Sequence, residues 1–506
     1  MTEKSIEEIN DRIEDGSVRV VTADRMSEIV SELGAEEAAK EVDVVTTGTF
    51  GPMCSSGVFL NFGHADPPIK MQRVLLNDVE AYAGIAAVDA YLGATQLSED
   101  KELNYGGGYV IEDLVAGKPI EMKATGYVTD CYPRKDLETT ITLEDLNQAI
   151  MVNPRNAYQR YAAAANSTDR TLYTYMGTLL PNYRNVNYSG AGALSPLYND
   201  PDFETIGVGT RIFLCGARGY VVGRGTQHDP ANRFGTLMVT GDLKEMDPEF
   251  LRGATFYGYG VTLFVGIGIP IPILNERMAK KTAIRDADIV TEVIDYGVSR
   301  RERPVLKKVT YEELKSGMIE LEGKEVPTSP LSSFFMANKV AEALKSEIEH
   351  DKFFLSPQVE RLPTDTVAKP MKQTELPLVK DVMIRDVKTI GDSASIAEAA
   401  KLIMESQSTH IPVLSGDGKL AGIITAWDIS TAVAQRHKEL AEIMTKKVIT
   451  SGLDEPLELV IRKMERSNIS ALPVIDDDRR VIGMVSSDEI SKLIGKRKKW
   501  QWKLRI

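Results

Sequence analysis

Two of the three cysteines lie in polar, turn-forming segments, where a thiol is available for chemistry. Cys54 lies in Gly48-Thr-Phe-Gly-Pro-Met-Cys-Ser-Ser-Gly57, whose glycine, proline and serine content predicts an exposed or ligand-facing loop. Cys131 follows the alternating stretch 120–128 and is flanked by Asp130 and Arg134, which predicts a strand end with a cation nearby. Both are candidate nucleophiles, and the alternative for each is an ordinary loop cysteine.

The third cysteine is predicted to be buried, whereas two of the histidines are predicted to lie in loops. Cys215 ends the apolar run 211–215, which is typical of a small buried hydrophobe. His64 and His228 lie in loop-like segments near Asp66 and Asp229, so both are candidates for proton transfer, with a solvated loop histidine as the alternative. Cys-x-x-Cys and His-Glu-x-x-His patterns do not occur, so we expect neither a protein-held zinc nor a four-cysteine iron–sulfur cluster.

A glycine-rich stretch at 265–272 resembles a dinucleotide loop only at first sight. Gly266 and Gly268 are followed by Pro270 and Pro272, which oppose the helix start that a phosphate-binding turn requires. Neither a nicotinamide site nor a Walker A loop is predicted.

Composition narrows the class of protein. The chain has 506 residues and a net charge of −13, which predicts about two to four domains and argues against a general nucleic-acid or anionic-membrane binder. The basic, aromatic tail 496–505 is the exception, and it either contacts an acidic partner or is solvated. With three cysteines, no N-terminal apolar region and no apolar run of about 18 residues, the expectation is a cytoplasmic protein.

The clearest organisation is a repeat near the C-terminus. Met444 lies 61 residues after Met383, and the same offset relates Pro412 to Pro473, Gly422 to Gly483 and Asp428 to Glu489. Each copy predicts a helix (395–406; 455–467), a strand starting at 410 or 470, a second strand at 422 or 483, and a final helix.

Prolines recur between residues 351 and 380, which predicts a linker or wrapping segment. The region before it, 1–350, reads as a mixed α/β (α+β) catalytic domain, and the repeats occupy 381–437 and 438–499. The predicted helices are 23–33, 156–165, 275–286 and 338–350, and the predicted strands are 43–47, 70–76, 211–215, 261–265 and 289–294.

The repeat pair resembles tandem cystathionine-β-synthase-type (CBS) domains of βαββα order, which bind adenosine ligands. The resemblance implies that a carboxylate three residues after a Ser or Thr holds the ribose hydroxyls. The corresponding pairs here are Thr425 with Asp428 and Ser486 with Glu489, and Glu489 departs from the usual Asp. S-adenosylmethionine is the expected ligand, with ATP or AMP competing. The alternative is that one or both clefts stay empty and the module only dimerises.

The segments 46–57, 130–134, 223–228 and 265–272 resemble the archaeal homocysteine-biosynthesis family. That resemblance implies an L-aspartate semialdehyde sulfurtransferase, with Cys54 and Cys131 handling sulfur. It implies sulfide as the second substrate, homocysteine as the product, a ferredoxin-like iron–sulfur partner and no tightly bound cofactor.

Electron counting agrees with this reading. Adding sulfide to an aldehyde and losing water gives a thioaldehyde, which needs two electrons to become a thiol. No nicotinamide site is predicted from the sequence. We therefore expect either that Cys54 and Cys131 supply both electrons by forming a disulfide, or that one of them carries sulfur as a persulfide while the other resolves it. Either route needs an external reductant, with His64 or His228 managing protons. The rivals are a cysteine-dependent dehydrogenase and a non-enzymatic adenosine sensor; we expect a homodimer.

Overall fold

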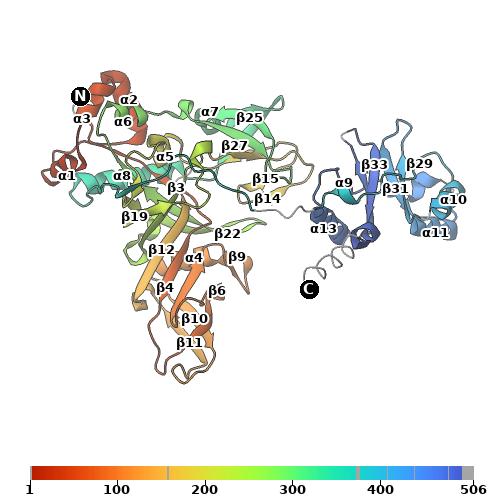
Figure 1. The fold of residues 1–506 in the computed structure, drawn as a ribbon, viewed down its shortest axis with the longest axis horizontal. Coiled ribbons are helices and arrows are strands. Elements are labelled where there is room, and N and C mark those ends of the chain that lie inside the picture. Colours follow the sequence, from red (N-terminus) through yellow and green to blue (C-terminus); the bar gives the residue numbers. More distant parts are fainter. Residues whose placement is uncertain are drawn as a thin grey trace, which may run out of the picture. The chain divides into compact units, whose positions relative to one another are not determined.

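The computed structural model describes residues 3–156, 159–371, 377–406, 408–437, 439–476 and 478–492. It comprises two compact units, Met1–Lys369 and Pro370–Ile506 (Figure 1). The division falls inside the linker expected at 351–380, of which 372–376 lie outside the described residues, as do Lys438 and the tail 493–506. Among the described helices, none has the length and apolar character needed to cross a bilayer.

The first unit begins with helices around a small sheet. The predicted helix 23–33 is confirmed as α2, and those predicted at 275–286 and 338–350 are found as α6 and α8. The bounds are α1 (Ile6–Glu14), α2 (Ala23–Leu33), α3 (Ala35–Glu41), α6 (Glu276–Lys281) and α8 (Phe334–Glu349). The sheet is β1 (Val20–Thr22), β2 (Val44–Thr46) and β23 (Pro270–Pro272), in that order. Both prolines of the 265–272 stretch therefore lie in a strand.

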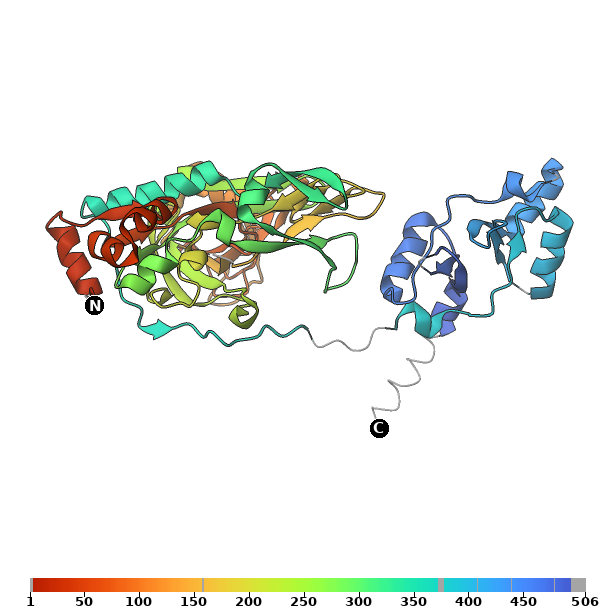
Figure 2. The ribbon, with the colours of Figure 1, turned by 90° about the horizontal axis from the view of Figure 1, so that it is seen from above.

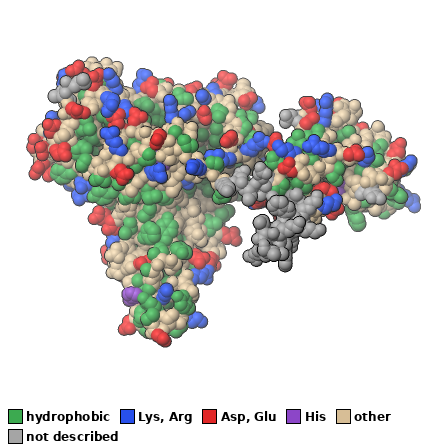
Figure 3. All heavy atoms as spheres, viewed as in Figure 1, with side chains coloured by type: hydrophobic (Ala, Val, Ile, Leu, Met, Phe, Trp, Pro, Cys, Tyr) green, Lys and Arg blue, Asp and Glu red, His purple; other side chains and the backbone are tan. Residues whose placement is uncertain are grey.

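The largest sheet has the order β21-β22-β18-β19-β20-β12-β4-β7, with β3 also pairing to β22. Its strands are β3 (Thr49–Pro52), β4 (Gly57–Asn61), β7 (Asp89–Gly93), β12 (Gln148–Asn156), β18 (Arg211–Leu214), β19 (Ala217–Arg224), β20 (Leu237–Asp242), β21 (Leu251–Phe256) and β22 (Gly260–Gly268). Buried and exposed positions alternate along β12 and β19, as expected when one face meets the core. Apolar side chains on the other face are visible over β12 and β4 (Figure 3).

A second, antiparallel sheet has the order β11-β10-β5-β6-β8-β9. Its strands are β5 (Met71–Leu76), β6 (Val79–Ala81), β8 (Leu97–Ser98), β9 (Glu102–Gly106), β10 (Ile120–Gly126) and β11 (Asp136–Ile141), and α4 (Gly107–Val115) follows β9. The β10–β11 hairpin, which carries Cys131 in its connection, lies at one end of this unit (Figure 1).

A mixed sheet has the order β25-β24-β13-β16-β27-β26. Its strands are β13 (Ala163–Ala165), β16 (Val186–Tyr188), β24 (Val290–Asp295), β25 (Val305–Thr310), β26 (Met318–Leu321) and β27 (Lys324–Pro330). A separate hairpin, β14 (Leu172–Thr174) with β15 (Gly177–Leu179), precedes β16.

The helix predicted at 156–165 is wrong. Asn156 ends β12, Ala163–Ala165 form β13, and residues 157 and 158 lie outside the described residues. The alanines that favour a helix are fully buried and pair with the parallel strand β24, so tertiary contacts override the local propensity.

Helix α8 sits unusually close to the strands that lead to Cys54. A methyl group on Gly48 would overlap the carbonyl oxygen of Ala337, and one on Gly268 would lie 3.2 Å from Leu344. Figure 2 shows α8, in teal, lying along one face of the unit. Glycine is therefore required at Gly48 by the close approach of two backbones, whereas Gly268 packs tightly against side chains of α8.

We expect Gly48→Ala to lower the free energy of unfolding of the first unit by about 1–3 kcal/mol, because α8 must shift to admit the methyl group. Gly223→Ala is the matched control, since a methyl group there meets no atom within 4 Å. Urea denaturation of both variants measures the difference. Equal stabilities would mean that α8 is not held against Gly48.

The second unit shows the predicted order in both copies. The first consists of β29 (Ile390–Gly391), α10 (Ile396–Ser406), β30 (His410–Leu414), β31 (Leu420–Thr425) and α11 (Ala426–Gln435). The second consists of a β-bridge at Ser451, α13 (Leu457–Ser467), β32 (Ala471–Ile475), β33 (Val481–Ser486) and a helix from Ser487. A short helix precedes each copy: α9 (Val379–Val382) the first and α12 (Leu440–Ile443) the second.

Candidate functional site

Cys54 lies in the turn between β3 and β4 and is half-buried. The Met53 amide donates to Leu263 O at 2.8 Å, which ties the turn to β22. From β12, the side chain of buried Asn153 donates to Ser56 Oγ at 2.7 Å. The loop predicted from glycine and proline content is thus a turn held between two strands.

Arg155, at the end of β12, lies beside this turn. Ser55 Oγ donates to Arg155 O at 3.3 Å, and Asn153 Oδ1 accepts from the Arg155 amide at 3.0 Å. Burial raises the pKa of the Cys54 thiol, and the positive charge of Arg155 opposes that rise. Cys54 is therefore mainly a thiol at neutral pH, with a cation close enough to stabilise its thiolate.

Tyrosines from three separate turns gather near Cys54. Burial raises the pKa of Tyr259, and the Cys54 charge acts on it in the same direction. The Tyr259 ring lies 6.4 Å from that of Tyr175, whose hydroxyl lies 2.7 Å from the Tyr296 hydroxyl. Arg303 lies 4.1 Å above the Tyr296 ring. Tyr259 and Arg155 are therefore the groups whose charges interact with Cys54, and Tyr259 begins a chain of aromatic contacts that ends at Arg303.

A small cavity borders this turn at Met53. A cavity of about 30 Å³ lies behind Met53, lined in part by Thr49, Ser189 and Tyr311. That volume holds about one water molecule. This cavity is therefore too small for a substrate the size of an amino acid.

Cys131 occupies a different setting, exposed in the β10–β11 connection. Its sulfur lies 3.5 Å from Thr129 Oγ1, and the Thr129 and Tyr132 backbones exchange hydrogen bonds of 3.1 Å. The Tyr132 ring stacks on His64 at 6.1 Å between centroids. The structure thus brings Cys131 and His64 into one neighbourhood.

The two candidate cysteines lie at opposite ends of β4. Cys54 precedes Gly57, whereas His64 and the Cys131 turn lie beyond Asn61. A strand of this length spans about 13 Å. Because a disulfide requires Cα atoms within about 7 Å, the disulfide version of the chemistry fails in this conformation, and the two thiols are free.

The role predicted for His228 as a proton carrier does not fit its position. The ring is buried, Nδ1 accepts from the Thr236 amide at 3.1 Å, and Nε2 donates to Pro363 O at 2.9 Å. Both nitrogens are occupied by backbone groups, so His228 ties the segment after α8 to the sheet. The loop pattern around it did not reveal this partner because Pro363 lies 135 residues away.

Cys215 is buried as predicted, and burial raises its pKa to about 12. Among the described residues, no group of three or more His, Cys, Asp or Glu side chains is arranged to hold a metal ion.

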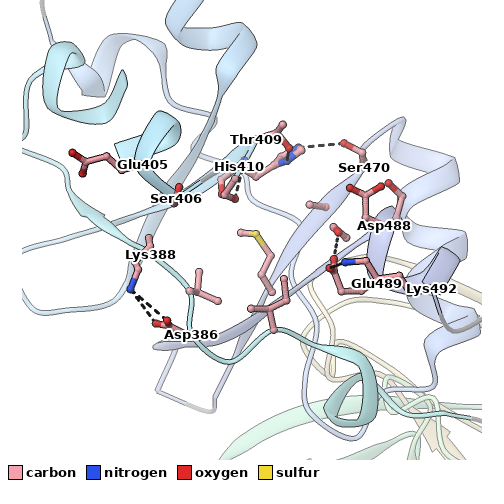
Figure 4. Close-up of a pocket in the computed structure, with 17 residues that line it drawn as sticks. Asp386, Lys388, Glu405, Ser406, Thr409, His410, Ser470, Asp488, Glu489 and Lys492 are labelled. Atoms are coloured by element: carbon pink, nitrogen blue, oxygen red, sulfur yellow. Dashed lines mark hydrogen bonds and ion pairs between the residues drawn. The ribbon is translucent and has the colours of Figure 1, made fainter. Parts of the chain in front are cut away.

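The second unit contains two clefts related by the 61-residue repeat. The larger has a volume of about 530 Å³ and includes Ile384, Lys388, Ser486 and Glu489 (Figure 4). The smaller, about 220 Å³, is lined by the repeat equivalents of several of these residues, including Thr445, Ile449 and Thr425. His410 belongs to both clefts.

The predicted ribose-binding pairs lie where the second strand of each copy meets its last helix. Asp428 Oδ2 accepts from the Thr425 amide and hydroxyl at 2.7 Å, forming a capping box for α11. Ser486 donates to Glu489, which Lys492 also contacts at 3.1 Å (Figure 4). The departure from Asp at Glu489 therefore keeps the pair intact.

His410, Ser470 and Ala471 line both clefts. His410 Nε2 lies 3.3 Å from Ser470 Oγ, and burial lowers the His410 pKa (Figure 4). The ring is therefore neutral at pH 7 and offers an adenine-sized ligand a polar but uncharged wall.

Residues 18–355 match the family described as homocysteine biosynthesis enzyme, sulfur-incorporation. The chain belongs to this family. Residues 379–435 and 440–496 each match the CBS domain, which confirms the reading of the repeat.

Two archaeal relatives match over the whole chain. An L-aspartate semialdehyde sulfurtransferase of Methanosarcina acetivorans is 59% identical over 499 residues, 98% of this chain and 100% of the relative. The protein of the same name from Methanocaldococcus jannaschii is 55% identical over 513 residues, with the same coverage. A solved CBS domain pair in complex with 5′-methylthioadenosine and S-adenosyl-L-methionine is 47% identical, covering 24% of this chain and 98% of that chain, with a TM-score of 0.24.

Sequence reasoning missed Arg155 and the tyrosines. Arg155 gave no signal because it lies near the end of an ordinary strand, β12. Tyr259 lies in the glycine-rich stretch 253–260, where alternating glycine and tyrosine was a usable sign of an exposed aromatic turn. Tyr175 and Tyr296 lie 121 residues apart in the sequence and meet only in the folded chain.

We expect Cys54 to react with neutral iodoacetamide along a pH profile whose midpoint lies above that of an ordinary thiol, because burial raises its pKa. The rate is measured by mass spectrometry in a Cys131→Ser background. Cys215 stays unmodified until the protein unfolds and is the internal control. A midpoint below that of a free cysteine would contradict burial as the dominant effect.

Proposed function

We propose that the first unit converts L-aspartate semialdehyde and sulfide, with two electrons from an external reductant, into L-homocysteine and water. The observation that carries the proposal is the pair of free thiols in two differently built settings, in a chain 59% and 55% identical over its length to two proteins of that activity. Family membership supports sulfur incorporation as the reaction class.

The reaction balances as follows. Hydrosulfide adds to the aldehyde carbon, forming the C–S bond, and water leaves to give a thioaldehyde. Two electrons and two protons then reduce the C=S bond to the thiol. If sulfur arrives instead as a cysteine persulfide, two further electrons and two protons release it as hydrogen sulfide and restore the thiol.

The settings of the thiols suggest a division of labour. Half-buried Cys54, next to Arg155, suits the carbon substrate, because a closed site excludes water from a reactive aldehyde. Exposed Cys131 suits sulfur acquisition, because a macromolecular donor can reach it. His64, in the neighbourhood of Cys131, is the proton carrier of this arrangement.

The reductant in this proposal is a low-potential iron–sulfur protein, which would deliver the two required electrons from outside the chain. The exposed turn of Cys131 is the point of delivery, since it is the thiol a protein partner can approach.

In single-turnover assays with aspartate semialdehyde, sulfide and a chemical reductant, Cys54→Ala and Cys131→Ala should reduce homocysteine formation to the uncatalysed level. Cys215→Ala, buried away from solvent, should retain activity once its folding is verified. Counting electrons consumed with sulfide or a persulfide donor separates the two sulfur routes. Full activity in both loop variants would refute the thiol mechanism.

For the second unit we propose an adenosine ligand, with S-adenosylmethionine favoured. Among the described residues lining the larger cleft, the carboxylates Asp386, Glu405, Asp488 and Glu489 outnumber Lys388 and Lys492. A triphosphate would be repelled by this balance, whereas a sulfonium cation is attracted. The Glu489 and Asp428 carboxylates can each accept both hydroxyl protons of a ribose.

By calorimetry on the full chain, S-adenosylmethionine should bind more tightly than ATP. Glu489→Gln should weaken binding in the larger cleft about 10- to 100-fold, since hydrogen bonds to charged groups contribute about 1.5–3 kcal/mol. Glu458→Gln, an exposed position paired with Arg462, is the control. Binding of ATP alone, or no heat with any of these ligands, would reject the assignment.

A further inference from the structure

Arg155 is a partly buried cation whose charge is not neutralised by its neighbours. Within the described part of the chain, its guanidinium makes no ion pair or hydrogen bond, and Nε is shielded from solvent without a partner. Arg252, by contrast, lies 3.2 Å from Glu112. A shielded guanidinium without a counter-ion is costly unless a bound anion completes it.

The groups around Arg155 do not supply that anion. Cys54 is mainly a neutral thiol at pH 7 because of its burial, and Tyr259 is a neutral phenol for the same reason. Asn153 contacts the Arg155 amide and not its guanidinium. Further along the tyrosine cluster, Arg303 adds a second guanidinium with an unpartnered, shielded Nε. Within the described residues, the groups shown next to the Arg155 guanidinium are therefore neutral.

We propose that Arg155 forms a carboxylate-binding subsite beside Cys54 that holds the α-carboxylate of an amino-acid aldehyde and presents its carbonyl carbon to the thiol. The planar guanidinium matches a carboxylate in a bidentate arrangement, which fixes orientation as well as position. This inference rests on the proposed function for the identity of the aldehyde, but not for the existence of the anion site.

The position of Arg155 fits an orienting role. Asn153 holds both the turn of Cys54, through Ser56, and the backbone of Arg155, so thiol and guanidinium share one support. The cavity beside Met53 is too small for a substrate, and the positive charge of Arg155 acts directly on Cys54. A carboxylate anchored there restricts the approach of the aldehyde to Cys54.

The first test uses alkylation and needs no enzyme activity. In the Cys131→Ser background, the rates of Cys54 modification by anionic iodoacetate and neutral iodoacetamide are compared as a ratio, which cancels the thiolate fraction. We expect Arg155→Gln to lower this ratio about threefold or more, and Arg252→Gln to leave it unchanged. An unchanged ratio in Arg155→Gln, with a native circular dichroism spectrum, would overturn the subsite.

The second test asks whether a carboxylate is bound. L-homoserine should protect Cys54 from iodoacetamide in the Arg155 protein, whereas L-homoserine amide, which lacks the carboxylate, should not. Arg155→Gln should abolish the protection and Arg155→Lys should retain part of it. Protection that is equal for the acid and the amide would show that the carboxylate is not recognised.

The third test separates carboxylate binding from activation of the thiol. If homocysteine formation is observed, Arg155→Gln should raise KM for aspartate semialdehyde about 10- to 100-fold with a smaller change in kcat. A fall in kcat alone would overturn the anchoring role in favour of thiol activation. Failure of the wild type to make homocysteine would refute the proposed function, while the alkylation tests still decide the subsite.

Discussion

The close contact between α8 and the glycines beneath it is the constraint on which the first unit depends. A methyl group on Gly48 would overlap the Ala337 carbonyl, and methyl groups on Gly266 and Gly268 would press on Val340, one turn further along the helix. The segment that starts at Gly48 becomes β3, pairs with β22 and ends in the Cys54 turn. Because protein cores do not compress, the depth at which α8 sits also sets where that turn emerges.

The buried side-chain amide of Asn153 is a second constraint on the geometry around Cys54. Asn153 donates to Ser56 and accepts from the Arg155 amide, and Ser55 also contacts its Oδ1 at 3.3 Å. A buried side chain whose donor and acceptor are both used holds its partners in one geometry. The thiol and its neighbouring cation therefore move together, although they lie about a hundred residues apart in the chain.

Local sequence patterns were sufficient to predict some of the helices and strands. The amphipathic helix Ala23–Leu33 and both copies of the repeat were predictable because their periodicity agrees with their environment. The alanines at 163–165 were not, since their strand exists only by pairing with β24. The cysteines were predicted from the turn-forming residues around them. The roles of Arg155 and Tyr296 depend on contacts with residues distant in the sequence, which a local pattern does not reveal. The proton-transfer role predicted for His228 does not fit its position for the same reason, because its partner Pro363 is distant in the sequence.

The position of the two thiols at opposite ends of β4 limits how sulfur can reach carbon. β4 pairs with β12 on one side and β7 on the other, so shortening the gap through the strand itself would break both ladders. Cys131 in the β10–β11 connection is exposed, and apart from the reciprocal Thr129 and Tyr132 bonds the connection contacts the segment 64–70 through Tyr132 and Arg134, outside the strand ladders of β4, so motion costs less there. If the thiols act on the same sulfur atom, the Cys131 turn must move toward Cys54. If the turn stays in place, sulfur must pass from Cys131 to the Cys54 site as hydrosulfide. Its release from a persulfide consumes two electrons before the carbon–sulfur bond forms, and reduction of the thioaldehyde consumes two more afterwards.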